Sequence, residues 1–156
     1  MKLIVKDFKD LTNKELYEIL SSRAEIFQIE QKIHYNDLDR IDYDSYHFFI
    51  QKNEKVIAYL RAYYEDDNKE RLRIGRVLTR NHGNGIGKEL LNDSIDFIKK
   101  NIYCKLICMD AQSHAIEFYK KFGFKVTSEE FLEEGVPHVK MELEIRWYNA
   151  RSIYKS

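Results

Sequence analysis

Apolar residues recur with period two or period 3.6 along this chain, and the order of the two patterns predicts a mixed sheet flanked by helices. Residues 2–8 alternate as a strand. Thr12 and Glu15 then have the spacing of a capping box, which predicts a helix start. The apolar stripe of this helix consists of Leu16, Ile19, Leu20 and Phe27. Residues 28–44 are acid-rich and show neither period, so we expect an irregular segment there.

The rest of the chain predicts a strand meander followed by alternating helices and strands. The expected strands cover residues 46–51, 56–64, 71–79, 104–110, 124–127 and 138–145, the first two joined by the turn at residues 52–55. Helices are expected from the glycine-rich turn to about Asn101 and from Ser113 to Phe122, before Gly123. The predicted fold class is therefore α/β, in the form of an α+β mixed sheet.

A change of period marks the strand at residues 71–79. Leu72 and Ile74 share one face, whereas Val77 and Thr79 fall on the other unless one residue is inserted between the two pairs. We predict a β-bulge at residues 75–76. A bulge would splay this strand from the next parallel one and open a slot for an extended cofactor arm. The simpler interpretation is that the glycine only relieves crowding.

Composition favours one domain over residues 1–156, with 44% hydrophobic residues to fill a core. The 26 basic residues balance the 26 acidic ones, so no overall field favours nucleic acid or an anionic membrane as a partner. No stretch reaches the roughly 20 apolar residues of a membrane helix, and the N-terminus has no long apolar segment. We therefore expect a cytoplasmic protein.

Cys104 and Cys108 lie in a largely apolar run that is typical of an interior strand. On an extended strand they would be about 13 Å apart, too far to form a disulfide with each other. The sequence predicts packed, reduced core thiols and no nucleophilic cysteine.

Three alternating glycines stand between the strand that ends at residue 79 and the next helix. Bare amides at a helix start bind phosphate, so we expect a cofactor with a pyrophosphate group. The dinucleotide fingerprint would need glycine at Lys88 or Leu90. The mononucleotide loop would need glycine at His82 and a hydroxyl at Glu89. Neither pattern fits.

The remaining pattern, Gly85-x-Gly87 before a Leu-Leu helix, resembles the coenzyme A loop Q/R-x-x-G-x-G/A of the GNAT acetyltransferase superfamily, with His82 in place of Gln or Arg. The resemblance implies acetyl-CoA as cosubstrate. It also implies a twisted sheet of six or seven strands with about four helices, split between the fourth and fifth strands. The implied cofactor-binding residues are Val77, Leu78, Thr79, His82, Gly83, Asn84, Gly85, Ile86, Gly87, Lys88 and Gln112.

A second segment, residues 111–124, resembles the A-x-x-x-Y-x-x-x-G-F motif that closes the GNAT cofactor site. By this resemblance Tyr119 is the candidate general acid for the departing thiolate, and Gln112 takes the place of an Asn that contacts the pantetheine arm. A phenol of pKa about 10 can return a proton to such a thiolate. The alternative is that Tyr119 and its neighbours Phe118 and Phe122 are core aromatics.

Further positions are similar to the ElaA-like branch of GNAT proteins, over roughly residues 23–141. They are Arg23, Phe27, Glu30, Gln31, Tyr35, Asp37, Asp39, Ala111, Gln112, His114 and residues 133–138. The substrate of that branch is poorly defined. The expected acceptor is therefore an amine of a small molecule or peptide.

An amine acceptor must lose a proton, so a general base is needed. The candidates are Glu30, His34, Asp37, Asp39, Asp42, His47 and His138. Glu30 is preferred because the apolar residues Phe27, Ile29 and Ile33 around it could partly bury it and raise its pKa. The alternative is that this acid-rich segment is an ordinary solvated loop and contains no catalytic base.

Arg71, Arg73 and Arg76 form a basic strand that suits a cofactor with several phosphate charges. An exposed strand face protected from edge pairing explains the first two equally well.

No metal is expected, because the histidines lack ligand spacing and a calcium loop from Asp37 fails at two positions.

Two other functions stay open. One is an acyltransferase similar to acyl-homoserine lactone synthases, which the segment from Arg23 to Phe27 faintly resembles, and the other is a non-catalytic coenzyme A sensor. A homodimer contact is conceivable at the apolar C-terminal strand with Trp147 and Tyr148.

Overall fold

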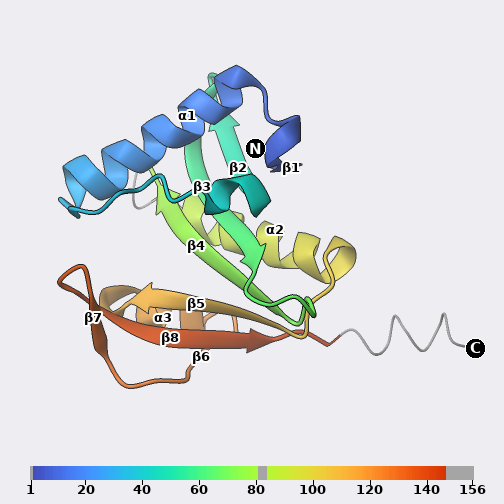
Figure 1. The fold of residues 1–156 in the computed structure, drawn as a ribbon, viewed down its shortest axis with the longest axis vertical. Helices are drawn as coiled ribbons and strands as arrows, with labels where there is room; N and C mark the ends of the chain where they lie inside the picture. Colours follow the sequence, from blue (N-terminus) through green and yellow to red (C-terminus); the bar gives the residue numbers. More distant parts are fainter. Residues whose placement is uncertain (1, 81–83, 147–156) are drawn as a thin grey trace, which may run out of the picture. The chain divides into compact units, whose positions relative to one another are not determined.

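The structure is a computed structural model that describes residues 2–80 and 84–146 (Figure 1). They form two compact units. The first unit comprises Met1–Tyr63 and Ile74–Ser94, and the second comprises Tyr64–Arg73 and Ile95–Ser156. The expectation of a single domain over residues 1–156 stays a prediction.

The residues that the structure describes form eight strands and three α-helices. The strands are β1 (Leu3–Asp7), β2 (Tyr46–Lys52), β3 (Lys55–Tyr64), β4 (Arg71–Thr79), β5 (Leu106–Gln112), β6 (Lys125–Val126), β7 (Phe131–Glu133) and β8 (Val136–Glu144). The helices are α1 (Asn13–Arg23), α2 (Ile86–Asn101) and α3 (Ile116–Lys120), with a π-helix η2 (Ala24–Glu30) and 3-10 turns η1 (Phe8–Asp10), η3 (Ile41–Asp44) and η4 (Ser113–Ala115). Hydrogen-bonded neighbours follow the order β1-β2-β3-β4-β5-β8-β6, with β7 on β8. None of the helices among the described residues is long and apolar enough to cross a membrane.

The first unit contains the predicted meander. β1 and β2 pair antiparallel, as do β2 and β3, with Phe48 opposite both Val5 and Leu60. Asn53 and Glu54 take φ values of 53° and 65°, which form the tight β2–β3 turn. The predicted hairpin is confirmed. Its inner face packs into a core formed by Ile19, Ile26, Phe27, Phe49, Val56, Tyr59 and Leu78.

Helix α1 begins where its capping box predicts. Thr12 Oγ1 accepts a hydrogen bond from Glu15 N at 3.0 Å, and Thr12 N donates to Glu15 Oε1 at 2.8 Å. The sequence predicted an irregular segment from residue 28. Instead, the helical chain continues as the π-helix η2 to Glu30. Wider π-turns are often found at functional sites.

Strand β4 is irregular at the predicted position. Arg76 has a φ of 54°, in the left-handed region that residues other than glycine rarely adopt. Such a residue within a strand is typical of a bulge. The parallel pairs of β4 with β5 run from Arg71 opposite Leu106 to Arg73 opposite Cys108. The expected split at the fourth and fifth strands is confirmed.

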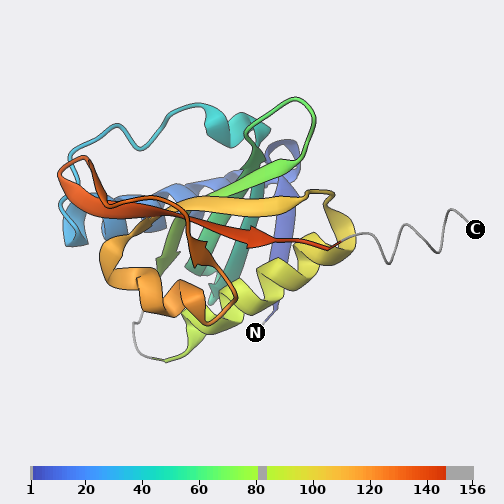
Figure 2. The ribbon, with the colours of Figure 1, turned by 90° about the horizontal axis from the view of Figure 1, so that it is seen from below.

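The second unit is built on β8. This strand runs antiparallel to β5, with Met109 opposite Met141, and the two lie side by side in Figure 2. It also pairs with β7 around a turn at Glu134 and Gly135, which have φ values of 49° and 75°. The sequence pattern missed β7, whose three residues are too few to show a period. Within residues 2–80 and 84–146 the sheet therefore has eight strands, where six or seven were expected.

Both cysteines are buried and free, as predicted. Burial raises the pKa of Cys104 to about 11. For Cys108, burial and the neighbouring Glu65 raise the pKa to about 12. Neither thiol is an activated nucleophile.

Candidate functional site

The predicted cofactor loop joins β4 to α2. His82 and Gly83 lie outside the described residues. Gly85 has a φ of 80°, a conformation that favours glycine, and there is open space where a side chain would stand. Asn84 Oδ1 accepts a hydrogen bond from the amide of Ile86 at 3.2 Å. The loop therefore turns sharply into the helix, with one starting amide already capped.

The first turn of α2 follows this cap. The amides of Gly87 and Lys88 lie in the first turn of α2, so the helix itself contains no carbonyl four residues before them. They stand at the positive end of a 16-residue helix. The side chain of Lys88 is exposed. This arrangement can accept an anionic group.

The end of β4 offers mainly backbone to a ligand. The Leu78 side chain is 3% exposed and belongs to the core, while Val77 and Thr79 are half-buried. Beyond the strand, Arg80 N donates to Ile57 O at 2.7 Å. Any contact of Leu78 with a cofactor must therefore come from its main chain.

The basic strand is neutralised within the protein. Arg71 pairs with Glu65 at 3.0 Å and Glu142 at 2.8 Å. Arg73 lies 3.2 Å from Asp110 and also pairs with Glu65. Carboxylates therefore already hold Arg71 and Arg73, which argues against the interpretation of these two arginines as a positive cluster for phosphate.

Carboxylates of the acid-rich segment are also engaged. Arg23 Nε donates to Asp37 Oδ2 at 2.9 Å, and its Nη1 donates to Asp42 Oδ1 at 2.7 Å. Arg61 donates to Asp42 Oδ1 at 2.9 Å and to Asp39 Oδ2 at 2.6 Å. Both guanidinium groups are buried, so these ion pairs form in a medium of low polarity.

Arg76 completes this network. Its Nε donates to Asp37 Oδ1 at 2.7 Å, and its Nη2 lies 3.3 Å from Asp39 Oδ2. The guanidinium also covers the ring of Tyr35, 4.9 Å from its centroid. The side chain at the irregular position of β4 thus ties residues 35–39 to the strand. We call the six charged residues the arginine–aspartate network: Arg23, Arg61, Arg76, Asp37, Asp39 and Asp42.

Charge and hydrogen bonding set the ionisation of this network. Burial opposes the charge on Asp39, but Arg61 outweighs it and the pKa of Asp39 falls to about 2. The pKa of Asp42 is likewise lowered against burial by Arg23 and Arg61. These carboxylates are held ionised and are poor bases.

His47 is a structural residue beside this network. Its Nε2 lies 2.9 Å from the carbonyl oxygen of Asp42, which can only accept, so Nε2 carries the proton. Its Nδ1 then accepts from the Tyr59 hydroxyl at 2.7 Å. Burial lowers the pKa of His47, which keeps the ring neutral. With both nitrogens occupied, it is a weak candidate for the base.

Glu30 stands apart from this network, at the end of η2. The expected burial is wrong, because Glu30 is exposed and the neighbouring Ile29 is 71% exposed. The π-helix turns these residues outward. The carboxylate is therefore reachable from solvent, and its role as base stays a prediction.

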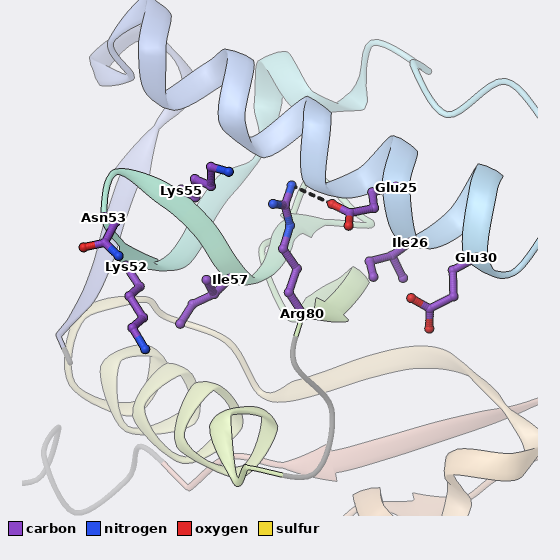
Figure 3. Close-up of a pocket in the computed structure, with 8 residues that line it drawn as sticks. All are labelled: Glu25, Ile26, Glu30, Lys52, Asn53, Lys55, Ile57 and Arg80. Atoms are coloured by element: carbon purple, nitrogen blue, oxygen red, sulfur yellow. Dashed lines mark ion pairs between the residues drawn. The ribbon is translucent and has the colours of Figure 1, made fainter.

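Glu30 lines a pocket of about 580 Å³ within the first unit (Figure 3). The pocket is lined by Glu25, Ile26, Glu30, Lys52, Asn53, Lys55, Ile57 and Arg80. Arg80 crosses its centre and pairs with Glu25 at 3.0 Å. Sequence reasoning missed this pocket, because no pattern links residues that come from a helix, a turn and a strand end.

Gln112 ends β5 in the second unit. Its Oε1 accepts from His114 Nε2 at 2.6 Å. In the β5–β8 register it stands opposite His138, whose Nδ1 donates to Val136 O at 2.7 Å. His138 is 6% exposed and stacks on Phe131. These contacts hold the β7–β8 hairpin against the end of β5.

Tyr119 lies on α3 in the second unit. Its ring contacts Phe118 and Phe124 edge to face, with centroids 5.3 Å and 6.0 Å away. Burial raises the pKa of Tyr119 to about 12, so the phenol stays protonated at neutral pH. Both earlier interpretations are compatible with this setting: a packed aromatic ring and a proton donor.

Metal ligands do not gather among the described residues: within 2–80 and 84–146, no group of three or more His, Cys, Asp or Glu side chains could hold an ion.

Comparison with known proteins gives the family. The family model of the acetyltransferase (GNAT) domain matches residues 8–145. The chain belongs to the GNAT acetyltransferase family. Among relatives of this GNAT protein, a UPF0039 protein of Schizosaccharomyces pombe is 34% identical over 149 residues, which cover 93% of this chain and 98% of that protein. ElaA of Escherichia coli is 32% identical over 140 residues, which cover 87% and 92%.

Solved structures agree with the GNAT assignment. The crystal structure of Escherichia coli ElaA matches with a TM-score of 0.85 and 31% identity, covering 92% of this chain and 99% of that chain. An acyl-CoA N-acyltransferase from Pseudomonas aeruginosa matches with a TM-score of 0.82 and 30% identity, covering 91% and 99%. The predicted family, the ElaA-like branch and the fold class are confirmed. Family and fold indicate an acyltransferase.

Proposed function

We propose that this GNAT protein transfers the acetyl group of acetyl-CoA to an amine of a small molecule or peptide, through a ternary complex. The single observation that carries the proposal is the start of α2. Gly85, with a φ of 80° and open space beside it, leads into first-turn amides suited to a pyrophosphate. The family match over residues 8–145 supports acetyl-CoA as the donor.

The chemistry is direct attack. A neutral amine nitrogen attacks the thioester carbonyl, a C–N bond forms, and the C–S bond breaks. A base removes the proton of the amine, for which we propose Glu30. Tyr119 gives its proton to the departing thiolate; burial raises the pKa of Tyr119 to about 12, which keeps the phenol protonated at neutral pH before this step.

The backbone of Val77, Leu78 and Thr79 would hold the acetyl and pantetheine end, with Gln112 on the arm. The pyrophosphate would be held by Gly85 together with its neighbours in the loop and the first helical turn, which are His82, Gly83, Asn84, Ile86, Gly87 and Lys88. No metal takes part in the proposed reaction.

Calorimetry with acetyl-CoA, followed by thiol-release assays against amines and peptide N-termini, tests the proposal. A protein that does not bind acetyl-CoA contradicts it. Tight binding without thiol release from any acceptor would support a coenzyme A sensor instead. Release only with longer acyl donors would favour a different acyltransferase.

Gly85→Ala is the decisive variant. An L side chain at a φ of 80° costs about 1 kcal/mol, which the loop escapes by changing shape. Affinity for acetyl-CoA should fall about fivefold. Gly135→Ala is the matched control, because Gly135 has a φ of 75° and equally open surroundings but lies in the β7–β8 turn. It should lower stability without changing affinity.

A further inference from the structure

The left-handed turn in β4 falls on an arginine, although a glycine stands directly before it. Arg76 has a φ of 54°, whereas the φ of Gly75 is not positive. Left-handed backbone is costly for an L residue and nearly free for glycine, so Arg76 is strained where its neighbour would not be. Such strain persists only where the surrounding structure holds the residue in place.

We propose that the Arg76 side chain holds this turn and that Arg76 is thereby a positioning residue for the acetyl transfer. The turn directly precedes residues 77–79. This role rests on the proposed function, because the main chain of residues 77–79 is the part proposed there to hold the acetyl and pantetheine end of acetyl-CoA.

The guanidinium group of Arg76 is fixed by several contacts. Its Nε donates to Asp37 Oδ1 at 2.7 Å, and its Nη2 donates to the carbonyl oxygen of Asp37 at 3.0 Å. Nη2 also lies 3.3 Å from Asp39 Oδ2, and the guanidinium carbon stands 4.9 Å from the ring centroid of Tyr35. The side chains of Arg76 and Asp37 are 16% and 7% exposed, so water screens their ion pair little.

The partners of Arg76 are themselves held by buried arginines. Arg23 of α1 donates to Asp37 Oδ2 at 2.9 Å, and Arg61 of β3 donates to Asp39 Oδ2 at 2.6 Å. A return of Arg76 to extended backbone would draw its guanidinium group away from this fixed frame. The charge-assisted hydrogen bonds that would then break together outweigh the strain of one left-handed residue.

The conformation of Arg76 sets the direction of the main chain that follows it. Because a peptide unit is planar, a change of φ at one residue rotates the next amide as a rigid group. The Leu78 side chain is 3% exposed and belongs to the core. The turn at Arg76 and the core contact of Leu78 therefore fix how the main chain between them faces a ligand. A misplacement of about 1 Å is enough to lower an enzymatic rate about 100-fold.

Glycine and alanine at residue 76 separate the turn from the side chain that holds it. Arg76→Gly and Arg76→Ala both remove the guanidinium group, but only glycine accepts a φ of 54° without strain. Calorimetry should therefore show Arg76→Gly binding acetyl-CoA about fivefold more tightly than Arg76→Ala, and both more weakly than the native protein. A glycine variant that binds no better than the alanine variant would contradict the proposal.

The nucleotide half of coenzyme A, 3′-phospho-ADP, is the control ligand. Its pyrophosphate is proposed to bind the loop before α2 and not β4. Its affinity should therefore be the same in the native protein and in both variants. A merely structural role of Arg76 would weaken both ligands alike.

Arg73 is the matched control position on the same strand. Its side chain is 20% exposed and pairs with Asp110 and Glu65, but its φ is not positive. At a regular strand position glycine is less favourable than alanine. Urea denaturation should therefore find Arg73→Gly less stable than Arg73→Ala, and the reverse order at residue 76. The same order of stability at both positions would overturn the proposal.

Arg76→Lys provides a variant in case the glycine and alanine proteins do not fold. Lysine keeps a positive charge beside Asp37 but cannot reproduce the forked contacts of the guanidinium group. We expect a folded protein that binds acetyl-CoA more weakly than the native one, with unchanged affinity for 3′-phospho-ADP. Equal losses of affinity for the two ligands would contradict a positioning role.

Thiol-release assays separate this role from the proposed function. Turnover and acetyl-CoA affinity that Arg76→Ala leaves unchanged would overturn the positioning role and leave the transferase standing. A native protein that does not bind acetyl-CoA would contradict the proposed function and with it the positioning role. The order of stabilities at residues 76 and 73 would still show whether the side chain holds the turn.

Discussion

Arg23 Nη1 donates to Asp42 Oδ1 at 2.7 Å, and the two side chains are 0% and 10% exposed. Helix α1 carries the arginine and η3 carries the aspartate, 19 residues later. The pair therefore fastens the segment between them to the core of the first unit. Acidic residues that seemed suited to catalysis instead hold this segment in place.

Removing Arg23 should strongly destabilise the protein. Arg23→Leu leaves Asp37 and Asp42 buried without one of their partners, which costs about 3 kcal/mol of the free energy of unfolding. Urea denaturation at pH 7 measures this. Lys14→Gln is the comparison, because it breaks the exposed ion pair of Lys14 with Glu54 and should have a far smaller effect. Equal effects of the two changes on the free energy of unfolding would show that the buried ion pairs contribute no more to stability than the exposed one.

Stability should fall in acid through the arginine–aspartate network. The pKa of Asp39 is about 2 in the folded protein and close to 4 when unfolded, so its contribution is complete above pH 4 and is lost toward pH 2. The unfolding free energy measured by urea should decline across this window. Asp39→Asn should lower stability at pH 7 and flatten the decline. Asp10→Asn replaces an exposed residue and should leave the decline in stability toward acid unchanged.

Tyr119→Phe should lower turnover about 100-fold with little change in acetyl-CoA affinity, since it removes a proton donor and keeps the ring packing. Because the pKa of Tyr119 is about 12, activity up to pH 10 should show no loss from its ionisation. Tyr17→Phe, the same change at a residue that is 73% exposed, should have no effect. If affinity alone fell, the assigned role would be wrong.

The native thiols should resist alkylation. Burial raises the pKa of Cys104 to about 11, and burial with Glu65 raises that of Cys108 to about 12, so the reactive thiolate is scarce at pH 8. Iodoacetamide should modify both residues in urea and neither in the native protein, as measured by mass spectrometry. Rapid native labelling of either cysteine would contradict the buried interior strand.

The amino-acid sequence by itself determined the local elements. Thr12 and Glu15 specify the start of α1, because a capping box needs only residues three positions apart. Alternation predicted β1 and β8, the apolar runs on either side of a turn predicted β2 and β3, and apolar neighbours predicted the burial of the cysteines. The two family motifs could be recognised in the sequence because each is a contiguous segment with fixed spacing along the chain.

Tertiary structure alone decided which charges meet. Arg61 reaches Asp39 across 22 residues, and Arg76 reaches Asp37 across 39. No period in the sequence encodes such pairs, because they depend on which segments fold against each other. The same holds for the pocket, where Arg80 meets Glu25 of the π-helix, and for Glu30, which that helix turns toward solvent. Periodicity reports only local geometry, whereas ion pairs and pockets require distant segments to converge.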